Sequence, residues 1–213
     1  VGGNWSKTGG FTANTGTVIF EGAGDATISG STTFYNLTCE EPGKTIYFTD
    51  GTTQRVTNIL TLSSTGANIV LTGTGKNGWT IEVTNPAYVS DVTVSYSTVG
   101  DAGQNIYASY STDAGHNDIV GPDAHWVFAT GDIYFWVATG AADWTTDNWR
   151  DTEQGSPVAG YHPDEAGAVA VFTDYYDADA TLDADISIDS IELQTGYAGT
   201  VVTDGWNMTL SGN

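Results

Sequence analysis

Between Asp177 and Asp189, polar and apolar side chains alternate without interruption. The odd positions carry five aspartates, one threonine and one serine, and the even positions carry only alanine, leucine and isoleucine. Because successive side chains of a β-strand point to opposite faces, this segment is predicted to be a strand with one apolar and one acidic face. The pattern favours β-structure with a one-sided core and an acidic exterior.

The whole chain shares this acidic character. Its 213 residues include 26 Asp and Glu against 5 Lys and Arg, for a formal net charge of −21. Nucleic acids and anionic membranes bind through basic patches, so this balance argues against both as partners. The aromatic content of 12% is too high for a disordered tail, and no segment approaches the roughly 18 apolar residues of a membrane span. We therefore expect a folded protein without membrane insertion.

Short β-rich runs recur about every ten residues, separated by Gly, Asn, Asp and Ser clusters. The fold predicted from this spacing is an all-β, right-handed parallel β-solenoid of two consecutive modules. Two β-sandwich or jelly-roll modules with strand exchange are the alternative. The solenoid is favoured because few tight Asn-Gly or Asp-Gly hairpins occur. The predicted strands are residues 17–20, 33–38, 45–48, 54–62, 68–72, 79–83, 89–96, 105–110, 126–128, 134–137, 168–172, 182–191, 200–203 and 208–210.

A module boundary is predicted beside Gly131, between two aromatic runs. It divides the chain into residues 1–131 and a more acidic module of residues 132–213. Cys39 has no partner for an intramolecular disulfide and is interpreted as a buried small hydrophobe. No signal segment precedes the initial Val-Gly-Gly, which favours a processed or excised piece, so an extracellular or cell-surface location is inferred from composition alone.

Tryptophan follows an acid or amide at Asp143-Trp144 and Asn148-Trp149, after the aromatic run Tyr134 to Val137. This block resembles a repeat module of large bacterial-type extracellular and cell-surface proteins, which are adhesin-like or fibre-like β-solenoids. Residues 12–20 and 31–38 are similar to a companion repeat of the same proteins. The resemblance implies a structural role and supplies no catalytic residues.

The chain begins with Val-Gly-Gly-Asn and ends with Leu-Ser-Gly-Asn, so the segment that starts at Trp5 could follow the last residue with little change in the sequence pattern. This likeness predicts tandem copies or head-to-tail polymerisation into a fibre or surface array, because an uncapped solenoid leaves backbone groups unpaired and another copy can pair them. The residues predicted at the assembly ends are Val1, Asn4, Trp5, Leu210 and Asn213.

The acidic face of the alternating segment is the strongest candidate cation site. Carboxylates two residues apart on a strand lie roughly 6.5 to 7 Å apart, and Ca²⁺ takes several oxygen ligands. No EF-hand or glycine-rich calcium repeat is present, so a solvated face is the competing interpretation. Calcium binding is predicted at Asp177, Asp179, Asp183 and Asp185, and no other cofactor is expected.

Two other functions compete with assembly. A carbohydrate-binding or adhesive surface module would stack sugars on exposed indoles, for which Trp144 and Trp149 are the candidates, although core packing is the more common use of tryptophan. A β-helix polysaccharide hydrolase or lyase is less favoured, because 26 acidic residues will always place some carboxylate pair at a suitable distance. No catalytic motif stands out, and the protein is not expected to be an enzyme.

Overall fold

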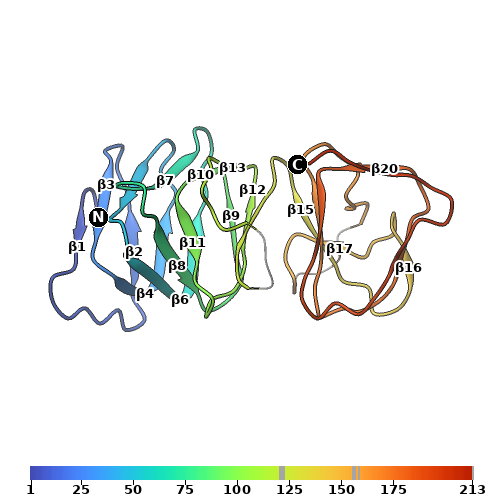
Figure 1. Ribbon diagram of the computed structural model, residues 1–213, viewed down its shortest axis with the longest axis horizontal. Helices are drawn as coiled ribbons and strands as arrows, with labels where there is room; N and C mark the ends of the chain where they lie inside the picture. The colour runs from blue at the N-terminus through green and yellow to red at the C-terminus, as the bar shows by residue number, and fades with distance from the viewer. Residues whose placement is uncertain (120–122, 155–156, 158, 213) are drawn as a thin grey trace. The chain divides into compact units, whose positions relative to one another are not determined.

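The computed structural model describes residues 1–119, 123–154, 157 and 159–212. Within this part of the chain every regular element is a β-strand, and the strands stack as β-solenoid coils, about 9 turns in all (Figure 1). Nearly all hydrogen-bonded neighbours run parallel, which confirms the solenoid and makes the antiparallel sandwich alternative wrong. The described residues contain no helix of the length and apolar character that crossing a bilayer requires.

The chain divides into two compact units, Val1–Phe128 and Ala129–Asn213. Each unit has its own hydrophobic core: the first extends from Phe20 to Trp126 and the second from Tyr134 to Ile188.

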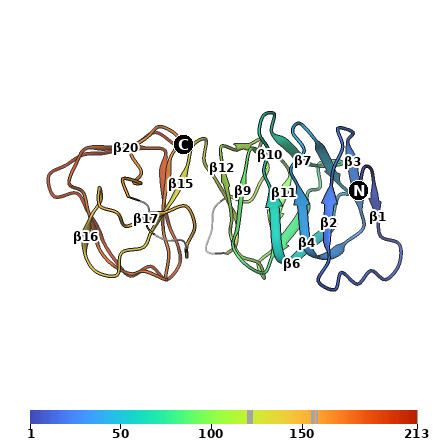
Figure 2. The ribbon, with the colours of Figure 1, turned by 180° about the vertical axis from the view of Figure 1, so that it is seen from behind.

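Unit 1 is built from three parallel sheets that wrap around one core (Figures 1 and 2). The first sheet contains β1 (Trp5–Ser6), β3 (Ala26–Ser29), β5 (Thr45–Phe48), β7 (Ile69–Gly73), β10 (Val92–Val94) and β13 (Thr112–Asp113). The second contains β2 (Thr17–Phe20), β4 (Thr32–Cys39), β6 (Thr53–Leu62), β8 (Trp79–Val83) and β11 (Ser97–Val99). The third contains β9 (Ala87–Ser90), β12 (Ile106–Ser109) and β14 (Trp126–Phe128).

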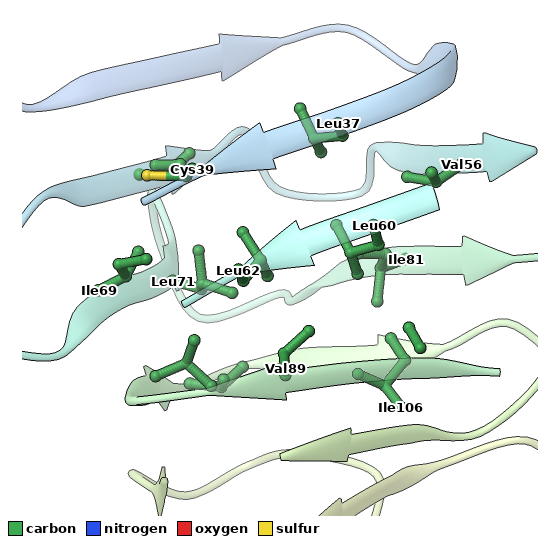
Figure 3. Close-up of a cluster of buried hydrophobic side chains, with 14 of the residues drawn as sticks. Leu37, Cys39, Val56, Leu60, Leu62, Ile69, Leu71, Ile81, Val89 and Ile106 are labelled. Carbon is green, nitrogen blue, oxygen red and sulfur yellow. The ribbon is translucent and has the colours of Figure 1, made fainter. Parts of the chain in front are cut away.

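Alternation along each strand places one side chain in the core and the next outside. Partners in register share a face, so Leu37 of β4 lies beside Leu60 of β6, and Val56 of β6 lies beside Val83 of β8. Figure 3 shows such side chains from successive coils meeting in one interior, with Cys39 among them. Cys39 is fully buried, as expected for a small hydrophobe, and burial raises the pKa of its thiol.

The corners of the coils require backbone conformations that most residues avoid. The predicted strand of residues 89–96 is divided at Asp91, which has a φ of 55° and separates β9 from β10. Tyr110 ends β12 in the same conformation, with a φ of 51°. Left-handed conformations of this kind reverse the chain direction at little cost in length, but for side chains larger than glycine they are uncommon. The strands therefore end at corners that the hydrophobic pattern did not mark.

Lys44 is a fully buried basic residue at the start of β5. Its ammonium group donates to the carbonyl oxygens of Glu21, Gly22 and Gly24 at 3.2, 2.9 and 2.6 Å. A buried charge is stable only when its hydrogen bonds are satisfied, and these three carbonyls supply the acceptors. Lys44 thus fixes the turn that connects β2 to β3.

Unit 2 has three smaller sheets and begins with a long coil, since Ile133 is in register with Val169 and Val169 with Ser190. The largest contains β17 (Trp149–Arg150), β15 (Ile133–Trp136), β18 (Val169–Phe172) and β21 (Ser190–Leu193), with β17 antiparallel to β15 and the rest parallel. The other two are β16 (Ala142–Asp143), β19 (Ala180–Thr181) and β22 (Val201–Val202), and the pair β20 (Ile186–Ile188) and β23 (Met208–Leu210). The β15–β17 pair is thus a local departure from the parallel arrangement predicted throughout.

The alternating segment from Asp177 to Asp189 is not one strand. It contains β19 and β20, which belong to different sheets and are joined by a bend. The alternation of burial nevertheless continues through the bend, since Ala180, Leu182, Ile186 and Ile188 are all buried. A solenoid coil keeps its inside and outside at a corner, so the pattern predicted the two faces correctly and the strand incorrectly.

Candidate functional site

The four aspartates predicted to bind calcium lie along the exterior of one coil of unit 2. Asp177 and Asp179 precede β19, and Asp183 and Asp185 lie between β19 and β20. Three of these side chains are exposed and Asp183 is half-buried. The acidic exterior is therefore present, but each carboxylate already has a partner in a neighbouring coil.

Three of these carboxylates accept backbone N–H groups from the coil that follows. The Oδ1 atom of Asp177 accepts from Ala198 N at 3.0 Å, and that of Asp179 accepts from Thr200 N at 2.8 Å. The Oδ1 atom of Asp185 accepts from both the backbone N and the side-chain Nδ2 of Asn207, at 2.8 and 3.0 Å. Ala198, Thr200 and Asn207 lie outside the strands, so the aspartates satisfy backbone donors that are not part of the sheet ladders.

The same contact recurs elsewhere in the chain. We call it a coil clamp, defined as an Asp or Asn side-chain oxygen that accepts a backbone N–H from the next coil. Besides the three aspartates above, coil clamps are formed by Asn4 to Thr27, Asn36 to Ile59, Asp50 to Gly75 and Asn77, Asn105 to His125, and Asp164 to Ser187. The sequence shows many Asp and Asn residues but not which N–H group each one meets, because the partners lie one coil away and several of them, such as Thr27, Ile59 and Ser187, lie inside strands.

Asp183 faces the preceding coil instead. Its Oδ1 accepts the backbone N–H of Thr145 at 3.0 Å, and its Oδ2 accepts the Thr145 hydroxyl at 2.5 Å. Burial acts to raise the pKa of Asp183, but the hydrogen bonds from Thr145 outweigh it and the pKa is lowered from its ordinary value of 3.8. Asp183 is thus held as a carboxylate that joins two coils.

No metal centre is assembled from these groups. Within the described ranges, no three His, Cys, Asp or Glu side chains come together in a way that could hold a metal ion. The coil clamps also occupy one oxygen of each of Asp177, Asp179 and Asp185. Calcium binding at the acidic exterior stays a prediction.

Trp144 and Trp149, the candidate glycan-stacking residues, are fully buried in the core of unit 2. Their ring centroids lie 4.7 Å apart, and both rings pack against Phe172. The indole N–H of Trp144 donates to the carbonyl of Pro163, and that of Trp149 donates to the carbonyl of Trp144. Neither ring presents a face to solvent, so the prediction that they stack on sugars is wrong.

The predicted assembly residues at the start of the chain lie in the first coil of unit 1. The amino group of Val1 donates to the Ile19 carbonyl at 2.6 Å, and Asn4 forms a coil clamp. Trp5 lies in β1, half-buried, and packs edge-on against Phe11 with ring centroids 5.0 Å apart. Phe11 in turn lies 6.3 Å from Phe34, so an aromatic group partly covers this end of the core.

The last coil of unit 2, residues 190–212, leaves its core open. Each of its strands β21, β22 and β23 pairs on one side only in the described part of the chain. Leu193 is in register with the fully buried Phe172, and Leu210 with the fully buried Ile188. Leu193 and Leu210 are nevertheless 58% and 52% exposed, because none of the described residues stacks over them.

The first coil of unit 1 and the last coil of unit 2 are therefore not equivalent, although the sequences of the two ends are similar. One carries an aromatic cover and the other an exposed continuation of the core. Asn213, the remaining predicted assembly residue, lies outside the described residues. No protein-family model, curated protein or solved structure matches this chain.

Proposed function

We propose that the protein is an extracellular structural protein, a subunit or repeat of a fibre or cell-surface array whose copies associate head to tail. The observation that carries this proposal is the open end of unit 2, where side chains in register with the buried core face solvent. The chemistry is self-association, with no catalytic step, and the partner is another copy of this chain.

The open end combines two incomplete interactions. Leu193 and Leu210 continue core rows, and Trp206 is also largely exposed on the same coil. Full burial of a leucine side chain is worth about 1.5–3 kcal/mol, so covering this coil supplies a hydrophobic driving force. The unpaired edges of β21, β22 and β23 add backbone donors and acceptors for an incoming coil.

The receiving surface is the first coil of unit 1. Its strands β1 and β2 each pair with a single neighbour, β3 and β4, and so also have a free edge in the described residues. Half-buried Trp5, Phe11 and Val18 provide apolar contacts beside these edges. A parallel strand added to each edge continues the arrangement that every other coil of unit 1 already has.

The acidic exterior gives the association a direction. A net charge of −21 makes side-to-side contact between copies repulsive, whereas the ends meet through apolar side chains and backbone groups. Such a surface supports linear growth without lateral bundling. The resemblance to repeat modules of extracellular β-solenoid proteins supports the same role and location.

Sedimentation velocity over a concentration series, with negative-stain microscopy, tests this proposal. We expect the wild-type mass to rise with concentration and linear particles to appear. The double variant Leu193→Asp/Leu210→Asp places charges at the open core and is expected to remain monomeric with an unchanged circular dichroism spectrum. The matched control is Ile59→Asp, which alters a side chain that is 54% exposed on the outer face of β6 and should assemble like wild type.

Two results would contradict the proposal. One is a wild-type protein that stays strictly monomeric at the highest concentration reached. The other is a double variant that assembles as well as the wild type, which would place the contact away from the open end.

A further inference from the structure

The parallel stacking of unit 1 is interrupted between β6 and β9. Residues Thr53–Val56 of β6 pair with β8, but Ile59–Leu62 have no ladder partner on the same side, although β9 lies beside them. The chain between β8 and β9 contains Asn85 and Pro86, and proline has no N–H to donate. The Asn85 side chain instead donates to the Asn58 carbonyl at 3.3 Å.

A groove of about 390 Å³ lies at this interruption, lined by Asn58, Ile59, Leu60, Thr61, Asn85, Pro86, Ala87 and Tyr88. Its volume falls within the range of roughly 300–1,000 Å³ found for small-ligand sites. We call it the β6–β9 groove. Figure 3 shows Leu60 and Val89, from the two strands that border it, pointing into the same core, so the groove lies on the outer side of these strands.

The backbone contributes polar groups to the groove. The N–H of Ile59 is directed to β4, where it donates to Asn36 Oδ1, and the N–H of Ser63 donates to Cys39 on the same strand. Because backbone groups alternate in direction along a strand, Leu60 directs its N–H and carbonyl toward β9. The Leu60 side chain is buried, so the main chain of this residue is what it offers to the groove.

The side chains give the groove a mixed apolar and amide surface. Tyr88 is 38% exposed, and its ring is stacked on Tyr107 with centroids 5.6 Å apart and an angle of 12° between the planes. This stacking holds a flat aromatic surface in place beside the exposed Ile59. The Asn58 and Asn85 amides and the Thr61 hydroxyl line the groove as neutral polar groups, with Asn58 Nδ2 donating to Asn36 Oδ1 at 2.8 Å.

We propose that the β6–β9 groove binds one or two residues of a neutral oligosaccharide chain. A pyranose has an apolar C–H face that matches the ring of Tyr88, and hydroxyls that both donate and accept, which suits the amide and hydroxyl side chains of the groove and the main-chain groups of Leu60 that face β9. None of the lining residues is charged, and the chain carries a net charge of −21, so anionic glycans are disfavoured. This site is independent of the open end in unit 2.

Titration calorimetry and saturation-transfer NMR with a panel of hexasaccharides test the inference. The neutral probes are cellohexaose, xylohexaose and mannohexaose, and the anionic probe is hexagalacturonate. We expect at least one neutral probe to bind and hexagalacturonate not to bind. Tyr88→Ala should weaken that binding about tenfold or more, whereas Tyr88→Phe, which keeps the stacked ring, should stay within about threefold of wild type.

The matched control is Tyr175→Ala, since Tyr175 is an exposed tyrosine of unit 2 outside the groove, and it should bind like wild type. Circular dichroism establishes that each variant is folded. Failure of all three neutral probes to bind, equal binding of hexagalacturonate, or wild-type affinity in Tyr88→Ala would each overturn the proposal. The double variant at Leu193 and Leu210 separates the two functions, because it should lose assembly and keep oligosaccharide binding.

Discussion

Replacing Asp185 separates the role of its hydrogen bonds from the role of its charge. Asp185→Ala removes the acceptor for two N–H groups of Asn207, and Asp185→Asn keeps an acceptor oxygen while removing the charge. Loss of a side chain that caps unpaired backbone donors at a helix N-terminus costs about 0.5–2 kcal/mol, and the coil clamp satisfies a donor of the same kind. With two bonds at an exposed site, we expect Asp185→Ala to lower the free energy of unfolding by about 1–2 kcal/mol.

Asp185→Asn should cost less than about 0.5 kcal/mol, because the lost charge-assisted bond is offset by weaker repulsion along the acidic exterior. Urea denaturation at pH 7, followed by circular dichroism, measures both variants, and Asp174→Ala controls for loss of an exposed carboxylate in the same unit. The reasoning is refuted if Asp185→Asn is as destabilised as Asp185→Ala, since the charge would then matter and the acceptor would not. Thermal unfolding of the wild-type protein after chelation, with and without millimolar calcium, tests the calcium prediction. A melting temperature that calcium leaves unchanged would contradict it.

Two further predictions each concern one side chain, the buried Lys44 and the half-buried Tyr197. Lys44→Met leaves three turn carbonyls without their donor and should destabilise unit 1 by about 2–4 kcal/mol in urea denaturation, whereas Lys7→Met, which removes one bond to Ser31, should cost less than about 1 kcal/mol. If Lys44→Met and Lys7→Met lowered the free energy of unfolding equally, the burial of Lys44 and its additional hydrogen bonds would not contribute to stability. Burial, together with the charges of Asp179 and Asp177, raises the pKa of Tyr197 to about 12 from its ordinary value of 10.0, so the folded state holds its proton more tightly. Stability should therefore fall as the pH rises from 10 through about 12, and Tyr197→Phe should reduce this fall when unfolding is compared at pH 9 and pH 11.5.

The faces of the strands could be predicted from the sequence more reliably than their ends. The alternation in Asp177–Asp189 identified the buried and exposed sides, because a solenoid keeps one interior around the whole coil. It could not show the bend between β19 and β20, since side chains alternate through the bend as they do along a strand. Asp91 likewise divides a predicted strand through its backbone conformation, which no hydrophobic pattern records.

The candidate sites were harder to predict, because they depend on which coil lies next to which. The Asx-Trp pairs indicated turns beside Trp144 and Trp149 but not the direction of the indoles, which point into the core. The partners of the coil clamps could be found only with the coil length, and this length varies: Val18 is in register with Leu37, and Val56 with Val83. The β6–β9 groove results from that variation, since a longer coil brings Pro86 to a position where the ladder would otherwise continue.

The coil clamps have a consequence for how such a chain can change over generations. Each clamp recognises a main-chain N–H, a group that every residue except proline carries, and so it places almost no demand on the side chain that it meets. A coil can therefore be duplicated, exchanged or deleted without a matching mutation at the residue whose N–H the clamp meets, provided that the Asp or Asn acceptor is kept. The demands that remain are those of the core, where side chains in register must still pack against each other.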